Sequence, residues 1–198
     1  MLYSVLRLFS LLILKVLFRL KVRGREHIPK KGAFILASNH VSYVDPVAVG
    51  VACPRRLNFM AKSDLFIHRW SSWFMSQLGG FEVKRDSADL SALKEAMRRL
   101  SNGEALMIFP EGSRSVNGKL FPPQAGVGFL AAKLNVPVIP AFVKGSEIAL
   151  PKGAKFLKPT KISVCFGKQI PIERRMPYED IARFIMENIR HLSCPVSN

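Results

Sequence analysis

Short apolar segments alternate with helical patterns along most of this chain, and that alternation constrains the fold more than any other feature. Each apolar segment is bounded by turn-forming residues, which is typical of strands buried on both faces. The predicted strands are 33–37, 57–61, 81–83, 105–109, 138–143 and 162–166. Helical patterns lie near 46–52, 69–78, 87–100 and 125–134, and a last one begins near Pro177. This order predicts an α/β domain with a largely parallel central sheet flanked by helices.

The length of the chain sets its domain organisation. Its 198 residues suffice for one substantial hydrophobic core and are too few for two comfortable ones. We expect an amphipathic membrane-associating helix over residues 1–21 and a single folded domain over residues 22–198. The stretch 144–159, rich in Gly, Pro and Lys, is predicted to form a surface loop.

The amino-terminal segment is mostly apolar, but Arg7, Lys15 and Arg19 interrupt it, and its longest uncharged run is 8–14. That run is far shorter than the roughly 18 to 20 apolar residues that a spanning helix needs. On a helix the three cations fall on one side, which predicts a helix lying in the membrane interface with its polar stripe outward. A helix buried in the core is one alternative. A signal peptide is another, although no small-residue cleavage site follows.

The charge balance requires an anionic partner. Thirty Lys and Arg residues stand against fourteen Asp and Glu, a formal net charge of +16. Five cations follow the amino-terminal helix directly, and each contributes about 1 kcal/mol near an anionic leaflet. They are Lys21, Arg23, Arg25, Lys30 and Lys31. An anionic membrane surface is therefore expected, and nucleic acid is not, because no nucleic-acid-binding module is recognisable.

Several classes of site lack their motifs in this chain. The three cysteines are widely spaced without a Cys-x-x-Cys pair, so neither a zinc site nor a disulfide framework is indicated, and a reducing compartment fits. The four histidines show no His-Glu-x-x-His spacing, and there is no phosphate-binding Gly-x4-Gly-Lys-Ser/Thr loop. We expect no metal and no other cofactor.

The chemistry is predicted to lie where Asn39-His40 and Asp45-Pro46 follow the first buried strand. Open α/β sheets place their ligand crevices at the carboxyl ends of strands. His40 and Asp45 point to different sides of a regular helix or strand, so they meet only across a turn. Pro46 predicts such a turn, with Asp45 as a helix cap.

A carboxylate beside His40 would orient the imidazole, leaving its other nitrogen to take a proton from a substrate hydroxyl. No serine or cysteine nucleophile is then needed. The alternative is a turn histidine beside an ordinary helix cap.

Gly126 and Gly128 lie in a Gly-x-Gly-x-x-Ala pattern that matches a dinucleotide-binding fingerprint. The pattern follows Pro122-Pro123-Gln124 and not a strand, so it lacks the context that gives it meaning. We expect instead that these glycines let a helix pack closely against a neighbour.

Four ordered blocks resemble the glycerolipid acyltransferases. They are Asn39-His40-x4-Asp45, the run 80–85, the run 109–115 and the run 136–140. The likeness is closest to the bacterial 1-acyl-sn-glycerol-3-phosphate acyltransferases and spans residues 22 to about 170. Ser113 stands where this family usually has Thr, and Gln124 lies near a position where it commonly has Lys.

The resemblance implies roles for named residues. His40 resembles the family's general base and Asp45 its orienting acid, while Arg85 resembles a residue that meets the acceptor's phosphate. Lys62 resembles a position where a cation stabilises charge on the thioester oxygen. The substrate-binding residues implied are Arg85, Glu111, Gly112, Ser113, Arg114, Lys62 and Asn39. Without the resemblance, Glu111 and Arg114 would be an ordinary surface ion pair.

The function implied is transfer of a fatty acyl chain from acyl-coenzyme A or acyl carrier protein to the sn-2 hydroxyl of lysophosphatidic acid, giving phosphatidic acid. We expect a peripheral or monotopic enzyme on the cytoplasmic face of the inner membrane. One alternative is an acyltransferase for another lysophospholipid or a lyso-aminolipid. Another is a basic, non-catalytic protein that binds lipid or nucleic acid.

Overall fold

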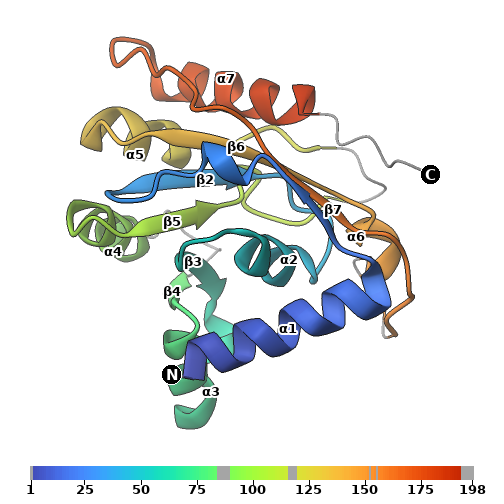
Figure 1. Ribbon diagram of the computed structural model, residues 1–198. Coiled ribbons are helices and arrows are strands. Elements are labelled where there is room, and N and C mark those ends of the chain that lie inside the picture. The colour runs from blue at the N-terminus through green and yellow to red at the C-terminus, as the bar shows by residue number, and fades with distance from the viewer. Residues whose placement is uncertain (1, 84–89, 116–119, 152, 155, 193–198) are drawn as a thin grey trace.

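A central sheet organises the computed structural model, which describes residues 2–83, 90–115, 120–151, 153–154 and 156–192. In these residues seven strands form one sheet in the order β1-β7-β6-β2-β5-β3-β4 (Figure 1). The strands are β1 (Lys21–Arg23), β2 (Phe34–Ser38), β3 (Leu57–Lys62), β4 (Gly80–Val83), β5 (Ala105–Ile108), β6 (Val138–Lys144) and β7 (Ser163–Phe166). Every pairing is parallel except that of β6 with β7. The predicted α/β fold with a largely parallel sheet is confirmed.

Helices cover both faces of the sheet. They are α1 (Leu2–Phe18), α2 (Asp45–Ala52), α3 (Arg69–Gln77), α4 (Leu90–Ser101), α5 (Gly126–Leu134), α6 (Ser146–Ala149) and α7 (Tyr178–His191), with short 3-10 turns η1 (Arg25–His27) and η2 (Ser63–Phe66). One core lies between the sheet and the pair α1 and α2, and the other lies beneath α4, α5 and α7 (Figure 1). Residues alternate between the two cores along β2 and β5, so both central strands are buried on both faces.

The predicted strands agree with the structure to within a residue at each end, but β1 was not predicted. Its sequence, Lys21-Val22-Arg23, lacks an apolar run, and the strand forms because its backbone pairs with β7 at the sheet edge. The prediction that 144–159 is only a loop was also incomplete, because α6 lies within it. The predicted start of the fourth helix, at 87, falls outside the described residues. The expectation of no disulfide is wrong at Cys165, which is disulfide-bonded, whereas Cys53 is a buried free thiol.

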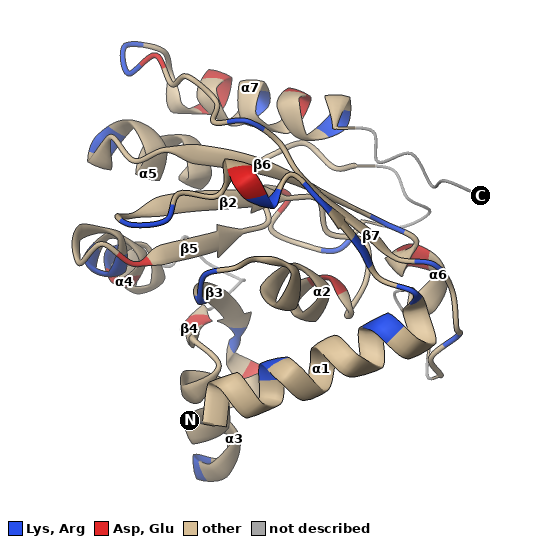
Figure 2. Ribbon diagram, in the orientation of Figure 1, with Lys and Arg blue, Asp and Glu red and all other residues tan. Residues whose placement is uncertain are grey.

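Helix α1 has one face against the protein and one face exposed. Leu14 and Phe18 are buried against the core that α2 shares. The opposite face exposes Val5, Leu8, Phe9, Leu12, Val16 and Leu17. In Figure 2 the helix is almost entirely uncharged. Core packing and an unpartnered apolar face, which the sequence offered as alternatives, therefore occur together on opposite sides of one helix.

The predicted outward stripe of cations on α1 is wrong at Arg7. Its guanidinium donates to the backbone carbonyl of Cys53 at 2.7 Å, where helix α2 ends. Carbonyl oxygens at a helix carboxyl end lack intrahelical donors and carry partial negative charge, so they attract a cation. Arg7 thus fastens α1 to the body of the protein. In the described parts of the chain, none of the helices has the length and apolar character needed to cross a bilayer.

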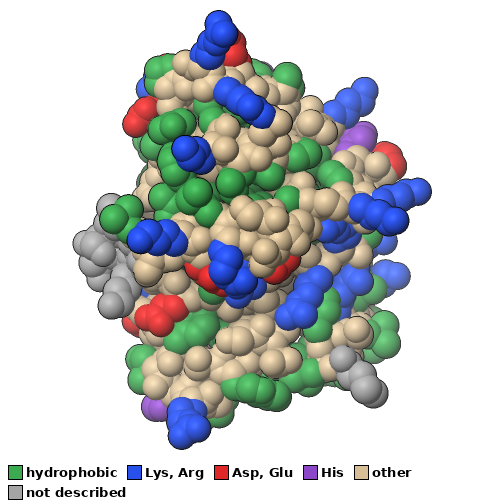
Figure 3. Space-filling model, turned by 90° about the vertical axis from the view of Figure 1, so that its left-hand side faces the viewer, with side chains coloured by type: hydrophobic (Ala, Val, Ile, Leu, Met, Phe, Trp, Pro, Cys, Tyr) green, Lys and Arg blue, Asp and Glu red, His purple; other side chains and the backbone are tan. Residues whose placement is uncertain are grey.

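The large positive charge is not gathered into one stripe on the side that Figure 3 presents, which is the left of Figure 1. Lys and Arg side chains are scattered there between apolar patches. Net charge alone therefore does not define a nucleic-acid groove on that side.

Helices α5 and α7 approach each other closely at Gly128. A Cβ atom on Gly128 would lie 2.1 Å from the carbonyl oxygen of Tyr178 and 3.2 Å from the amide nitrogen of Ala182. Gly126, two residues earlier, has open space around its Cβ position. The expectation that glycine serves close helix packing therefore holds at Gly128 and not at Gly126.

We predict that Gly128→Ala lowers the free energy of unfolding by about 1–3 kcal/mol, because the added methyl group pushes α7 away from α5. Gly126→Ala is the matched control and should be neutral or slightly stabilising, because alanine favours a helix and nothing obstructs it. Urea unfolding followed by circular dichroism measures both. Equal destabilisation by the two substitutions would contradict the packing argument.

Candidate active site

His40 and Asp45 meet in the loop between β2 and α2. The Nδ1 atom of His40 lies 3.0 Å from Oδ2 of Asp45, and the exposed fractions of the two residues are 7% and 0%. An ionised carboxylate only accepts hydrogen bonds, so Nδ1 carries the proton and Nε2 is the basic nitrogen. The pair therefore has the arrangement of a general base with its orienting acid.

Asp45 does not cap helix α2 as predicted, because α2 begins at Asp45 itself and its N-terminus has no side-chain cap. Oδ2 instead turns back to accept the backbone N–H groups of Val41 at 2.7 Å and Ser42 at 2.8 Å. The tight turn after His40 points both N–H groups at one place, and a buried N–H without a partner is costly. One carboxylate oxygen thus fixes the loop and the imidazole together.

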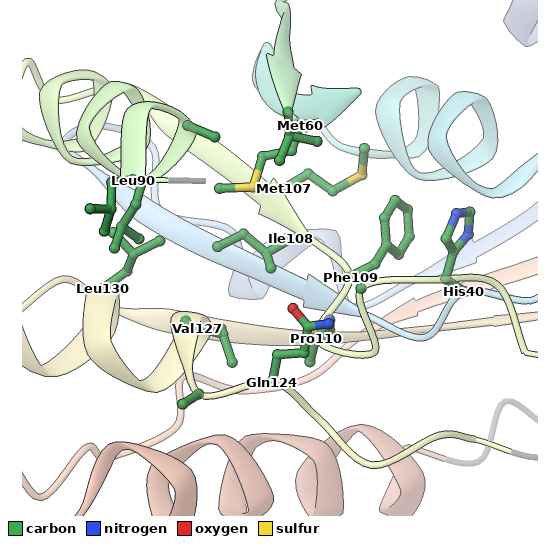
Figure 4. Close-up of a pocket in the computed structure, with 16 residues that line it drawn as sticks. His40, Met60, Leu90, Met107, Ile108, Phe109, Pro110, Gln124, Val127 and Leu130 are labelled. Atoms are coloured by element: carbon green, nitrogen blue, oxygen red, sulfur yellow. The ribbon is translucent and has the colours of Figure 1, made fainter. Parts of the chain in front are cut away.

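The ring of His40 is also held from its face. It stacks on Phe109 with ring centroids 4.0 Å apart and an interplanar angle of 17°. Phe109 follows β5 directly, and in Figure 4 its ring lies beside His40. The stacking fixes the plane in which Nε2 meets a substrate.

Glu111 and Asn39 tie the loop of His40 to backbone groups of other segments. Glu111 accepts the N–H of His40 through Oε1 at 2.9 Å and the N–H of Phe121 through Oε2 at 2.8 Å. Burial raises the pKa of the Glu111 carboxyl above its ordinary value, although both backbone N–H groups act in the opposite direction. Asn39 donates to the carbonyl of Val143 at 2.9 Å and accepts its N–H at 2.7 Å. Both side chains position the loop, and their predicted part in substrate binding stays a prediction.

These positioning contacts were not visible in the sequence. Glu111 bonds to the backbone of His40, 71 residues away, and Asn39 bonds to the backbone of Val143, 104 residues away. Backbone partners carry no residue-type signal, so only the folded chain reveals them. The one available indication was that both residues flank a predicted carboxyl end of a strand.

Arg114 and its neighbours lie on the adjoining loop. The guanidinium carbon of Arg114 lies 3.3 Å from the ring centroid of Tyr43, and its Nη1 atom is buried with no hydrogen-bond partner in the described residues. Gly112 lines the cavity at φ +67°, and a Cβ there would lie 2.5 Å from the Gln124 amide nitrogen. Ser113 lies between Gly112 and Arg114 and is partly buried.

Of the other two predicted cations, the structure describes only Lys62, which does not join this cluster. Lys62 ends β3, is about half exposed and pairs with Asp64. Arg85 lies outside the described residues. Within the described residues, no group of three or more His, Cys, Asp or Glu side chains is placed to hold a metal ion.

An apolar cavity of roughly 440 Å³ extends away from His40. It lies where β3 diverges from β5, because their pairing ends at Phe59 and Met107. Its walls are mainly apolar and comprise Met60, Val83, Leu90, Ala92, Leu93, Met107, Ile108, Phe109, Pro110, Gly112, Gln124, Ala125, Gly126, Val127 and Leu130. Figure 4 shows His40 at one end and Leu90 and Leu130 at the other. A base therefore stands at the end of a chamber suited to a hydrocarbon chain.

Comparison with known proteins shows to which protein family the chain belongs. The Acyltransferase family model matches residues 19–144, well over half of the chain, so the chain belongs to this family and is an acyltransferase. The matched residues include His40, Asp45, Glu111 and Arg114.

Individual relatives within this family share one kind of name. The chain is 28% identical over 151 residues to 1-acyl-sn-glycerol-3-phosphate acyltransferase of Bacillus subtilis, a match that covers 76% of this chain and 73% of that protein. It is 27% identical over 156 residues to the chloroplastic BAT2 enzyme of that name from Brassica napus, covering 77% of this chain and 45% of the longer plant protein. The crystal structure of PlsC from Thermotoga maritima, the 1-acyl-sn-glycerophosphate acyltransferase, superposes with a TM-score of 0.81 at 25% identity, covering 99% of this chain and 81% of that one.

Proposed function

We propose that this chain transfers a fatty acyl group from an acyl thioester to the sn-2 hydroxyl of lysophosphatidic acid, forming phosphatidic acid. The observation that carries the proposal is the His40–Asp45 pair, 3.0 Å apart, at the end of the apolar cavity. The names of the relatives, which are 1-acyl-sn-glycerol-3-phosphate acyltransferases, support this acceptor.

His40 acts as the general base in the proposed reaction. Its Nε2 takes the proton of the sn-2 hydroxyl while that oxygen attacks the thioester carbonyl carbon. The tetrahedral intermediate then breaks its carbon–sulfur bond, and the imidazolium returns the proton to the leaving sulfur. Asp45 holds the tautomer and stabilises the imidazolium, as the acid of a hydrolase triad does. The acceptor oxygen is the nucleophile, so no acyl-enzyme forms.

The two substrates occupy different surfaces in this proposal. The acyl chain of the donor lies in the apolar cavity, with its carbonyl carbon beside His40. The phosphate of the acceptor meets Arg114, with Arg85 proposed as a second cation and Gly112 and Ser113 lining the same turn. Acyl-coenzyme A and acyl carrier protein both present an acidic phosphopantetheine region that suits a basic protein.

We also propose that residues 1–21 attach the acyltransferase domain, 22–198, to the cytoplasmic face of the inner membrane. The exposed apolar face of α1 supplies the hydrocarbon contact. The cations from Lys21 to Lys31 follow directly and suit an anionic leaflet.

His40→Ala should lower turnover by about 10² or more, because it removes the imidazole that takes the hydroxyl proton in the proposed reaction. Formation of radiolabelled phosphatidic acid from lysophosphatidic acid and palmitoyl-coenzyme A is the measurement. His191→Ala, at an exposed histidine on α7, is the control and should keep full turnover. Unchanged turnover in a folded His40→Ala variant would remove the mechanism.

Leu130→Phe should shorten the acyl chamber at the end far from His40. Turnover with the longest acyl thioesters should fall by roughly fourfold for each methylene that no longer fits, since one buried methylene contributes about 0.8 kcal/mol. Shorter donors serve as the internal control and should keep their rates. If all chain lengths slowed equally, the cavity would not hold the acyl chain.

Leu8→Glu and Leu12→Glu should each weaken binding to vesicles containing phosphatidylglycerol by about tenfold or more, because a leucine leaves the hydrocarbon. Phe184→Glu changes an exposed apolar residue on α7 and is the matched control. Cosedimentation with anionic vesicles, neutral vesicles and DNA measures binding. Tight DNA binding, with vesicle binding unaffected by these substitutions, would instead favour a nucleic-acid-binding protein.

A further inference from the structure

Tyr43 has no place in the chemistry described so far, although it lies between the two residues of the catalytic pair. Its ring is about half exposed, which is unusual for a large aromatic side chain beside a buried reaction centre. The guanidinium carbon of Arg114 lies 3.3 Å from its ring centroid. That is van der Waals contact, so the planar guanidinium rests on the face of the ring.

The loop that carries Tyr43 is held on both sides. The N–H of Ser42 donates to Asp45, and the hydroxyl of Ser42 donates to the carbonyl of Leu150 at 2.8 Å. The N–H of Val44 in turn donates to the Ser42 hydroxyl at 3.2 Å. The position of the ring therefore depends on the same carboxylate that orients the catalytic base.

The loop of Arg114 is tied to the same place. The N–H of Ser115 donates to the carbonyl of His40 at 2.8 Å. The loop of Arg114 is thus hydrogen-bonded to the backbone of His40, and the guanidinium lies on the ring of Tyr43 from the turn after His40. These contacts restrict the distance between Arg114 and Nε2 of His40.

Among the described residues, no acidic side chain forms an ion pair with Arg114. Glu111, three residues earlier, already accepts two backbone N–H groups. Buried polar atoms normally have partners, and Nη1 of Arg114 has none in the described residues. The missing partner is the kind of group that a substrate supplies.

A ring and a carboxylate hold a guanidinium in different ways. A carboxylate would occupy the N–H edge and cancel the charge, and so would compete with phosphate. An aromatic face binds the flat side and leaves the in-plane N–H groups free for two oxygens of one phosphate.

We propose that Tyr43 is a positioning residue that holds Arg114 as an uncompensated cation, oriented for the phosphate of the acceptor. The inference rests on the proposed function and deepens it, because it makes acceptor recognition depend on an anionic headgroup at a restricted distance from His40. Tyr43 itself touches no reacting atom.

Equilibrium binding tests this separately from turnover. Isothermal titration calorimetry with a short-chain, water-soluble lysophosphatidic acid should show that Tyr43→Leu weakens binding about fivefold, the effect expected for a lost cation–π contact. Tyr43→Phe keeps the ring and should restore the wild-type affinity. Monoacylglycerol of the same chain length lacks phosphate, and its binding should not respond to either substitution.

A double-mutant cycle distinguishes positioning from a general structural effect. Arg114→Ala should weaken lysophosphatidic acid binding more than Tyr43→Leu does, and adding Tyr43→Leu to it should change nothing further. Additive effects, an unaffected Tyr43→Leu or a Tyr43→Phe as weak as Tyr43→Leu would each overturn the proposal. Failure of the wild-type protein to form phosphatidic acid, with these affinities as expected, would instead refute the proposed reaction alone.

Discussion

The buried carboxylate of Asp45 is the constraint on which the site depends. A single oxygen accepts the imidazole N–H of His40 and the backbone N–H groups of Val41 and Ser42. Loss of that oxygen would leave buried donors unpaired and release the ring at the same moment. The orientation of the His40 ring and the conformation of the loop over residues 39–45 therefore depend on the same oxygen atom. A substitution that removes this oxygen changes both.

Contacts from distant strands complete this arrangement. Glu111 after β5 binds the backbone of His40, and Asn39 pairs with Val143 in β6. Parallel strands bring these segments together because their carboxyl ends share one edge of the sheet. The loop that carries the base is thus fixed by the strands on both sides of β2, and pre-organisation of this kind spares the reaction the cost of ordering it.

Apolar surface serves two different purposes in this chain. The cavity beside His40 lies where β3 leaves β5 before either strand ends, and residues of α4 and α5 form part of its wall. The outer face of α1 stays exposed because its inner face and Arg7 already join it to the core that α2 shares. In the proposed function, the cavity holds one acyl chain and the face of α1 contacts the bilayer, so a lipid substrate would stay out of water for most of its path.

Much of the fold followed from local patterns. Buried strands have continuous apolar sequences, so the six apolar runs of the sequence matched β2 to β7. Strand β1 was not predicted, because it forms through backbone pairing at the sheet edge and not through side-chain burial. The spacing of His40 and Asp45 required a turn between them, and the structure contains that turn. The helix-cap role of Asp45 was wrong because its carboxylate accepts the N–H groups of Val41 and Ser42, in the turn before the helix. The outward stripe was wrong at Arg7 because its guanidinium reaches the carbonyl of Cys53, 46 residues away along the chain.

The sequence by itself determined the alternating α/β order, the meeting of His40 and Asp45 across a turn and the apolar amino-terminal helix, since each depends on residue types at short spacing. Only the tertiary structure decided that Glu111 and Asn39 support the loop, that Tyr43 carries Arg114 and that a cavity begins at His40. Those features arise from backbone atoms and side chains that are far apart along the chain and meet only when the sheet forms. Sequence patterns at short spacing therefore do not predict these long-range contacts.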